Sequence, residues 1–168
     1  RDLHSFPTRR SSDLDLSLKA KTVFAQAGEH MNLNGGYGVK RINEDGSWEY
    51  TPSRNSSSWI SLTYGKQVKG ILFAGYVRNF GTKDALATDA LGNIQGYYFS
   101  KNSFSNMNRL WRLSPTVLFT WGKFQLGLEY EITSAQYGKN LKASNGLAET
   151  DLHWVTNHKV QLMTKFNF

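Results

Sequence analysis

The chain has 168 residues, with 20 Lys and Arg against 13 Asp and Glu, a formal net charge of +7 and no cysteine. The absence of cysteine excludes a disulfide framework and a thiolate metal site. No uninterrupted apolar run approaches the ~20 residues of a membrane helix. The mean hydropathy of −0.49 is typical of soluble proteins, but it also fits a transmembrane β-barrel, in which only alternate residues face lipid.

Residues 1–14 read RDLHSFPTRRSSDL and resemble the translation of a common sequencing adapter, whose bases fit every codon of the segment. A secretory signal would need an apolar stretch of ~7–15 residues, which this segment lacks. We therefore interpret residues 1–14 as non-native and disordered. The native part then keeps 17 basic residues (20 less three) and 11 acidic residues (13 less two), a net charge of about +6.

The first segment with period-2 alternation is 16–26, LSLKAKTVFAQ. One face carries Leu16 and Phe24 and the other carries Lys19 and Lys21, as a strand with one apolar face requires. This segment is therefore predicted to be a strand.

The next two segments are 57–65 (SSWISLTYG) and 70–80 (GILFAGYVRNF), joined by a short turn at 66–69. The first alternates, with Ile60 and Leu62 on one face. The second is more evenly apolar, so the pattern predicts a strand without assigning its two faces.

A hairpin is predicted from 110–121 (LWRLSPTVLFTW) to 124–137 (FQLGLEYEITSAQY), with the turn at 122–123. Both arms exceed the ~9–11 residues that a tilted transmembrane strand needs. Pro115 lies within the first arm, where it must forgo a ladder hydrogen bond.

The register set by this turn places Ser114 opposite Glu131, with Arg112 one diagonal away. Opposite charges at this spacing attract each other across a pair of strands. The sequence therefore predicts an Arg112–Glu131 ion pair.

The segment 154–168 (WVTNHKVQLMTKFNF) has the clearest alternation. A helix through these residues would scatter the polar positions around the apolar side. The apolar face comprises Val160, Leu162, Thr164, Phe166 and Phe168, and the polar face comprises Lys159, Gln161, Met163, Lys165 and Asn167.

The connections are of two lengths: 66–69 and 122–123 are short, whereas 29–56, 81–108 and 138–153 are long and polar. Short turns on one side and long loops on the other are typical of outer-membrane barrels. Six strands ending at Phe168 place the C-terminus on the short-turn side. The pattern predicts an all-β, antiparallel up-and-down meander of about six long strands that forms part of a transmembrane β-barrel.

The last strand resembles the C-terminal strand of Gram-negative outer-membrane β-barrel proteins, which the barrel-assembly machinery reads. The residues that carry this resemblance to an assembly signal are Val160, Leu162, Phe166 and Phe168. The segment 109–138 also resembles the closing hairpin of porin-like proteins, whereas Thr164 departs from the pattern, since a larger apolar residue is usual there. A closed bacterial barrel needs at least ~8 strands, so we interpret residues 15–168 as the C-terminal part of a single barrel domain.

The resemblance implies a porin-like channel in the bacterial outer membrane for passive diffusion of small hydrophilic solutes. Its partners would be outer-membrane lipid, the assembly machinery and those solutes, and a homotrimer stays open. Pore-lining side chains are expected at Lys19, Lys21, Arg112, Gln125, Glu129, Glu131, Lys159, Gln161 and Lys165. Membrane-interface aromatics are expected at Trp111, Trp121, Phe124, Tyr130 and Trp154. A lining with a basic excess predicts a mild anion preference, unless salt bridges fill a closed lumen.

Catalytic and metal-binding patterns are not found. His153 and His158 are five apart on a strand, so they point to opposite faces and cannot share a metal. Glu129 and Glu131 share a face, but on a barrel paired carboxylates more often line water. The basic residues are dispersed along strands rather than clustered, which argues against nucleic acid. We expect neither an enzyme nor a cofactor.

Two alternatives remain. One is the barrel of a TonB-dependent transporter, which also ends in an aromatic strand and would require a much longer upstream sequence. The other is a non-channel outer-membrane barrel with adhesive or structural loops, which would give no conductance.

Overall fold

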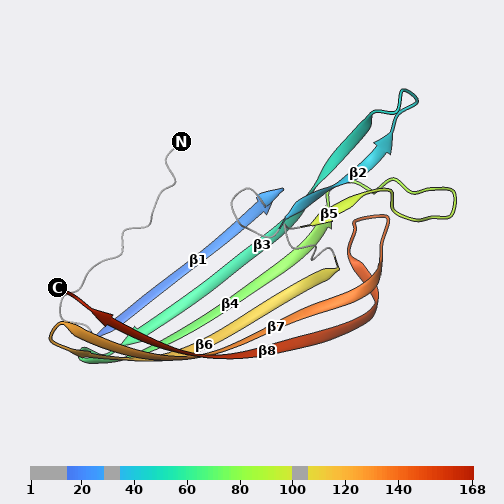
Figure 1. Ribbon diagram of the computed structural model, residues 1–168. Coiled ribbons are helices and arrows are strands. Elements are labelled where there is room, and N and C mark those ends of the chain that lie inside the picture. Colours follow the sequence, from blue (N-terminus) through green and yellow to red (C-terminus); the bar gives the residue numbers. More distant parts are fainter. Residues whose placement is uncertain (1–14, 29–34, 100–105) are drawn as a thin grey trace.

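The computed structural model describes residues 15–28, 35–99 and 106–168, and these form an antiparallel sheet curled into a half-barrel (Figure 1). Residues 1–14, expected to be a disordered non-native segment, lie outside the described residues. The strands are β1 (Leu16–Gln26), β2 (Gly36–Ile42), β3 (Trp48–Tyr64), β4 (Val68–Thr82), β5 (Tyr97–Phe99), β6 (Met107–Trp121), β7 (Phe124–Leu141) and β8 (Ala148–Phe166).

The six long strands are neighbours in chain order, because β1 pairs with β3 and the sheet continues through β4, β6 and β7 to β8. Every pairing is antiparallel. The short strands β2 and β5 extend one corner of the sheet, where β2 pairs with the first part of β3 and with β5. The predicted antiparallel meander of about six long strands is confirmed, and the structure adds two short strands to it.

The short connections, 65–67 and 122–123, lie at the same end of the sheet as the C-terminus (Figure 1). The opposite end, which we call the loop end, carries the end of β1 and the connections after β2, β4 and β7. Gly65 and Gly122 have φ values of +109° and +56°, a region that glycine enters without steric cost. The predicted separation of short turns from long connections is therefore present.

The long strands run further toward the loop end than the alternation predicts. β3 begins at Trp48, β7 continues to Leu141 and β8 begins at Ala148. The predictions that 29–56 and 138–153 are loops are therefore wrong over most of their length. Backbone pairing between neighbouring strands keeps these residues extended, although their mixed polar composition has no period-2 signal.

Pro115 affects one side of its strand. The β6–β7 pairing runs from Arg109 to Leu113 and resumes at Thr116, whereas Pro115 remains paired with Leu72 of β4. The gap in the β6–β7 pairing indicates that the hydrogen bond lost to the missing N–H is on the β7 side.

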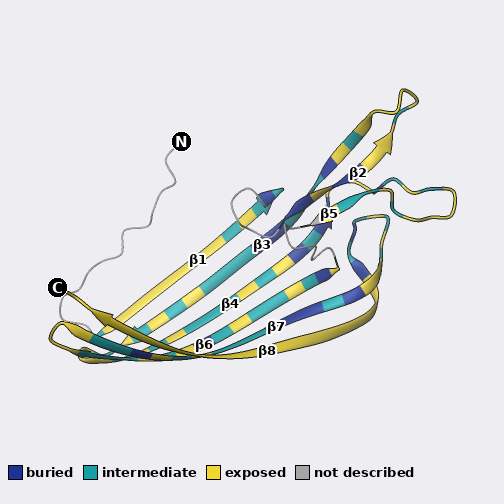
Figure 2. Ribbon diagram, viewed as in Figure 1, coloured by how far each residue is buried: buried dark blue, intermediate teal, exposed yellow. Residues whose placement is uncertain are grey.

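The conventional hydrophobic core is small and lies at the loop end, where Figure 2 shows most of the buried residues. Met107 and Ala135 pack together with Tyr97, Leu110 and Tyr137 around them. The β4–β5 and β7–β8 connections are tied to each other by the hydrogen bonds Thr82 N to Asn145 O and Leu86 N to Ala143 O, both 2.7 Å. Among the residues that the structure describes, the other buried apolar side chains are Val39, Leu86 and Ala148.

Candidate functional site: the two faces of the curled sheet

Strand register gives the long strands one continuous polar face. Lys19 of β1 lies opposite Ser61 of β3, and the row continues through Phe73 of β4 to Ser114 of β6. The Arg112–Glu131 ion pair joins β6 to β7 on this face, and Glu131 lies opposite Lys159 of β8. The structure brings all nine expected pore-lining residues to this face: Lys19, Lys21, Arg112, Gln125, Glu129, Glu131, Lys159, Gln161 and Lys165.

The opposite side of the sheet is a continuous apolar face. Leu62 lies opposite Leu18 on one side and Leu72 on the other. Val117 lies opposite Leu128, which in turn lies opposite Leu162. The register also assigns the two faces of β4 that the sequence leaves open. Leu72, Ala74 and Tyr76 are on the apolar face, and Ile71, Phe73 and Val77 are on the polar face.

The apolar face is the more exposed of the two. Leu128 and Leu72 are 51% and 46% exposed, whereas the Glu131 side chain is 15% exposed and Ser114 is 5% exposed. Side chains crowd together on the inside of a curved sheet, so the polar face is the concave one. This arrangement reverses that of a water-soluble sheet, which buries its apolar face.

Hydrogen bonds link the charged groups of β6 and β7. Arg112 Nη1 lies 3.5 Å from Glu131 Oε2, as the register predicts, and Arg112 Nε donates to Thr133 Oγ1 at 3.1 Å. Thr133 Oγ1 donates to Glu131 Oε1 at 3.3 Å, and Thr116 Oγ1 donates to Glu129 Oε2 at 3.1 Å. Both carboxylates on this face are therefore held in place by neighbouring donors.

Four lysines of the polar face lie on the two edge strands, and of these Lys159 lies opposite Glu131. Lys19 and Lys21 are on β1, at one edge of the sheet, and Lys159 and Lys165 are on β8, at the other edge. In the described part of the chain, none of the four forms an ion pair. With Arg112 they give the nine residues five positive charges against two negative ones, which makes the face electropositive.

Two aromatic side chains on the polar face were not predicted. Trp59 stacks on Phe73, with ring centroids 6.1 Å apart and an interplanar angle of 29°, and Gly75 lies directly opposite Trp59. The sequence could have predicted Trp59 on the polar face, since its segment alternates and Ile60 and Leu62 lie on the other face. Phe73 could not, because its segment is evenly apolar.

Aromatic side chains are concentrated at the short-turn end of the apolar face. Trp121 stacks on Phe119 and Phe124, with centroids 5.6 and 6.4 Å apart. Phe124 lies opposite Phe166, whose ring contacts Phe168 at 5.4 Å. Of the assembly-signal residues, Val160, Leu162 and Phe166 share this face, and Phe168 follows the end of β8.

A second aromatic level lies nearer the loop end. Trp111 lies opposite Tyr76 and is ten residues from Trp121 on the same strand. Ten residues of strand span ~33 Å, which corresponds to ~25 Å along the axis of a barrel whose strands tilt by ~40°. Trp154 lies opposite Gln136, one residue pair of this face beyond Trp111 toward the loop end. Tyr130 lies between the two aromatic levels, opposite Val160.

Polar side chains on the apolar face are paired across strands. Tyr130 Oη lies 2.7 Å from His158 Nδ1. Ser134 Oγ lies 2.8 Å from Thr156 Oγ1, and Thr22 donates to Ser58 at 3.1 Å. Such pairing satisfies polar groups that would be costly in an apolar medium.

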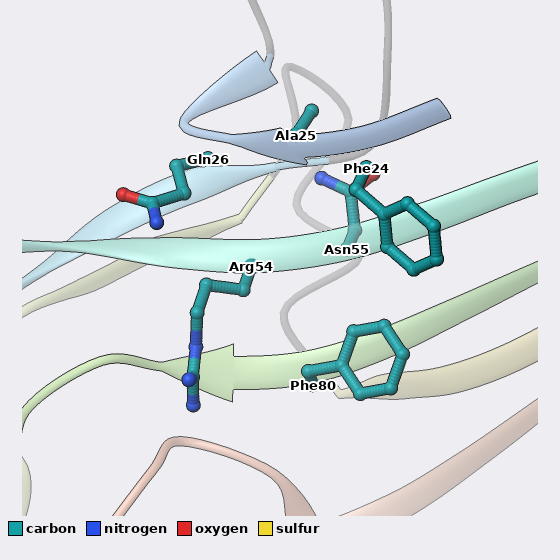
Figure 3. Close-up of a pocket in the computed structure, with 6 residues that line it drawn as sticks. All are labelled: Phe24, Ala25, Gln26, Arg54, Asn55 and Phe80. Atoms are coloured by element: carbon teal, nitrogen blue, oxygen red, sulfur yellow. The ribbon is translucent and has the colours of Figure 1, made fainter. Parts of the chain in front are cut away.

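A hollow of about 490 Å³ opens at the loop end of β1, β3 and β4 (Figure 3). Arg54 donates from Nη2 to the Thr82 carbonyl at 3.1 Å, but its buried Nε has no hydrogen-bond partner. The lining residues are Phe24, Ala25, Gln26, Arg54, Asn55 and Phe80.

Comparison of the chain with protein-family models, curated proteins and solved structures gives no match. Among the described residues, no helix is long and apolar enough to cross a membrane. No three His, Asp or Glu side chains gather as a metal site in the same residues.

Proposed function

We propose that residues 15–168 form part of a porin-like channel of the bacterial outer membrane that passes small hydrophilic solutes. The observation that carries this proposal is the reversed arrangement of the two faces. An exposed apolar face bounded by aromatic levels ~25 Å apart matches the lipid-facing band of a transmembrane barrel. A concave face lined by charged and hydroxyl side chains suits a water-filled lumen.

The edges of the sheet support the same proposal. In the described residues β1 pairs only with β3, and β8 pairs only with β7. Hydrocarbon offers no hydrogen-bonding partner to an open strand edge, so a spanning sheet must close on itself. We therefore propose that strands from a longer chain join β1 to β8, and that the C-terminal strand is read by the assembly machinery.

Solute selectivity in this proposal comes from the excess of basic side chains on the polar face. In the described residues Lys19, Lys21, Lys159 and Lys165 form no ion pair, and with Arg112 they outnumber the two carboxylates of β7. Anions therefore experience a lower electrostatic barrier than cations. The channel is therefore expected to conduct by passive diffusion with a mild anion preference.

Conductance tests the proposal directly. The complete gene product that contains residues 15–168, added to a planar bilayer under a salt gradient, should give conductance steps with an anion-selective reversal potential. Replacing Lys19 and Lys21 by Glu should shift the reversal potential toward cation selectivity, whereas Lys123→Glu, in a short turn, should shift it less. A folded protein without conductance would overturn the channel proposal.

The flanking DNA provides a second test. An upstream signal peptide followed by further alternating strands would support an exported barrel of porin size. A plug domain and a much longer upstream sequence would favour the TonB-dependent transporter instead. A start codon just before Asp15 without a signal would contradict the membrane proposal.

A surface role for the loop end is a second candidate, because the β2–β3 hairpin projects beyond the sheet (Figure 1) and carries exposed aromatic rings. Tyr37 packs edge-on against Tyr50 at 5.4 Å and lies 5.5 Å from Tyr98, and Trp48 lies 6.5 Å from Tyr50. Exposed aromatic clusters often mark interaction sites. A protein that folds in vesicles without conducting, yet loses adhesion when Tyr50 is replaced by Ser, would favour this adhesive role.

A further inference from the structure

The apolar face ends, toward the loop end, in three arginines on neighbouring strands: Arg54 on β3, Arg78 on β4 and Arg109 on β6. We call them the arginine patch. Arg78 and Arg109 are direct cross-strand partners. Each is two residues from a member of the Tyr76–Trp111 pair, and hence on the same face as that pair. Arg54 is two residues from Ser56, which lies opposite Arg78, but a β-bulge follows and Arg54 itself lies opposite Gly81.

Two like charges directly opposite each other destabilise a sheet, so this pairing requires an explanation. Within the described residues, the carboxylates that form ion pairs do so with other cations, and none pairs with the arginine patch. Arg78 instead lies over the ring of Phe80, 5.1 Å from its centroid. The patch therefore combines three positive charges with the unpartnered Nε of Arg54.

The surface around the patch is apolar. Phe24 is 75% exposed and lines the hollow at Arg54 together with Phe80 (Figure 3). On the other side of the patch, the apolar face continues from Tyr76 and Trp111 toward the short turns. A ligand that satisfies both surroundings must carry a compact anion and an apolar chain.

We propose that the arginine patch binds the phosphate group of an anionic membrane lipid. Guanidinium groups recognise phosphate oxygens through bidentate, charge-assisted hydrogen bonds, and a shared phosphate removes the repulsion between Arg78 and Arg109. The acyl chains lie on the apolar face below. This inference rests on the proposed function, because it places the patch at the headgroup level beside the aromatic edge of the lipid-facing band.

The test compares the complete gene product in phosphatidylcholine vesicles and in phosphatidylcholine vesicles containing phosphatidylglycerol. We expect the unfolding midpoint of the wild-type protein to rise with phosphatidylglycerol content. Removing one basic residue weakens attraction to an anionic surface about fivefold. Arg78→Gln with Arg109→Gln should therefore lower the apparent affinity for phosphatidylglycerol by about 25-fold, whereas Lys123→Gln, at the opposite end of the sheet, should not change it.

The single variant Arg109→Gln gives a signature that loss of structure would not. In phosphatidylcholine alone it should be as stable as the wild type or more stable, since the like-charge pair is gone, yet it should respond less to phosphatidylglycerol. An equal lipid response in the wild-type protein and the double variant would overturn the inference. So would equal stabilisation by inorganic phosphate added to phosphatidylcholine vesicles, which would identify a small free anion instead.

Conductance measured on the same preparations separates the two proposals. Conductance without a lipid response contradicts the arginine patch proposal alone, and a lipid response without conductance contradicts the channel alone. A protein that does not enter either kind of vesicle contradicts both.

Discussion

The loop end and the barrel wall of this molecule follow opposite rules of burial. We use barrel wall for the part of the six long strands between the short turns and the Tyr76–Trp111 pair. At the loop end, Val39, Leu86 and Met107 are 2–5% exposed, and apolar and aromatic side chains pack around Met107. In the barrel wall the apolar side chains are the exposed ones, as for Leu62, Leu72 and Leu128.

The proposed membrane location would account for this difference, because the two regions would then meet two different solvents. The hydrophobic effect drives apolar side chains out of water, which explains the core at the loop end. It cannot explain a wall whose apolar face is exposed along six strands, unless that face meets an apolar medium. Substitutions in one region, compared with the response of the other, test this difference.

The largest effect is expected from an arginine on the apolar face of the barrel wall. Leu62→Arg should destabilise the protein in vesicles by about 2–4 kcal/mol, the range for a cation near the bilayer midplane. Thr63→Arg, the adjacent residue on the polar face, is the matched control and should change stability by at most about 0.5 kcal/mol. Urea unfolding in vesicles measures both variants. If the apolar face met water, the two substitutions would be similarly mild.

A smaller and local loss of stability is expected when a side chain is truncated in the core at the loop end. Leu86→Ala should cost about 2 kcal/mol, the low end for a buried leucine, because the connection that carries it can relax. Amide exchange in residues 83–96 should accelerate by about thirtyfold, without a change in β7. Leu91, which is 88% exposed in the same connection, provides the control, since Leu91→Ala should leave exchange unchanged. Faster exchange throughout β7 would show that the two regions are not separable.

The barrel wall was the more predictable of the two regions. The alternation gives the bounds of β1 as observed and the face of every predicted pore-lining residue, because a strand with one apolar and one polar face leaves a period-2 signal. It does not reveal β2 or the first half of β3. These strands lie beyond the apolar face, where cross-strand pairing keeps the chain extended.

The site was predicted less completely, because contacts between strands depend on register. The turn at 122–123 is short enough to fix the register of β6 against β7, and it predicts the Arg112–Glu131 ion pair. No comparable turn joins β4 to β6. The opposition of Arg78 and Arg109 therefore appears only in the structure.

The Arg112–Glu131 ion pair distinguishes a wet lumen from a closed one. A double-mutant cycle with Arg112→Gln and Glu131→Gln should give a coupling energy of about 0.5–1 kcal/mol, as expected for a pair partly exposed to water. In a dry lumen, removing one partner would leave an uncompensated charge and cost about 3–5 kcal/mol. Urea unfolding of the four proteins in vesicles measures the coupling. A coupling energy of about 3–5 kcal/mol would favour a lumen filled by salt bridges and contradict the channel.

The smallest effect is expected from acid at the turn 43–47 of the β2–β3 hairpin. The hydroxyl and backbone N–H of Ser47 donate to Asp45 and lower the pKa of that carboxyl below its ordinary value of 3.8. A carboxyl with a lowered pKa in the folded state stabilises the turn above its ordinary pKa, and this contribution is lost as the pH falls through the lowered value. Amide exchange of Ser47 should therefore accelerate relative to its intrinsic rate below about pH 3.8, and Asp45→Asn should abolish this pH dependence. If the acceleration were unchanged in Asp45→Asn, another carboxyl of the hairpin would be responsible. Glu49 is the first to test, because Lys40 and Arg41 lower the pKa of its carboxyl.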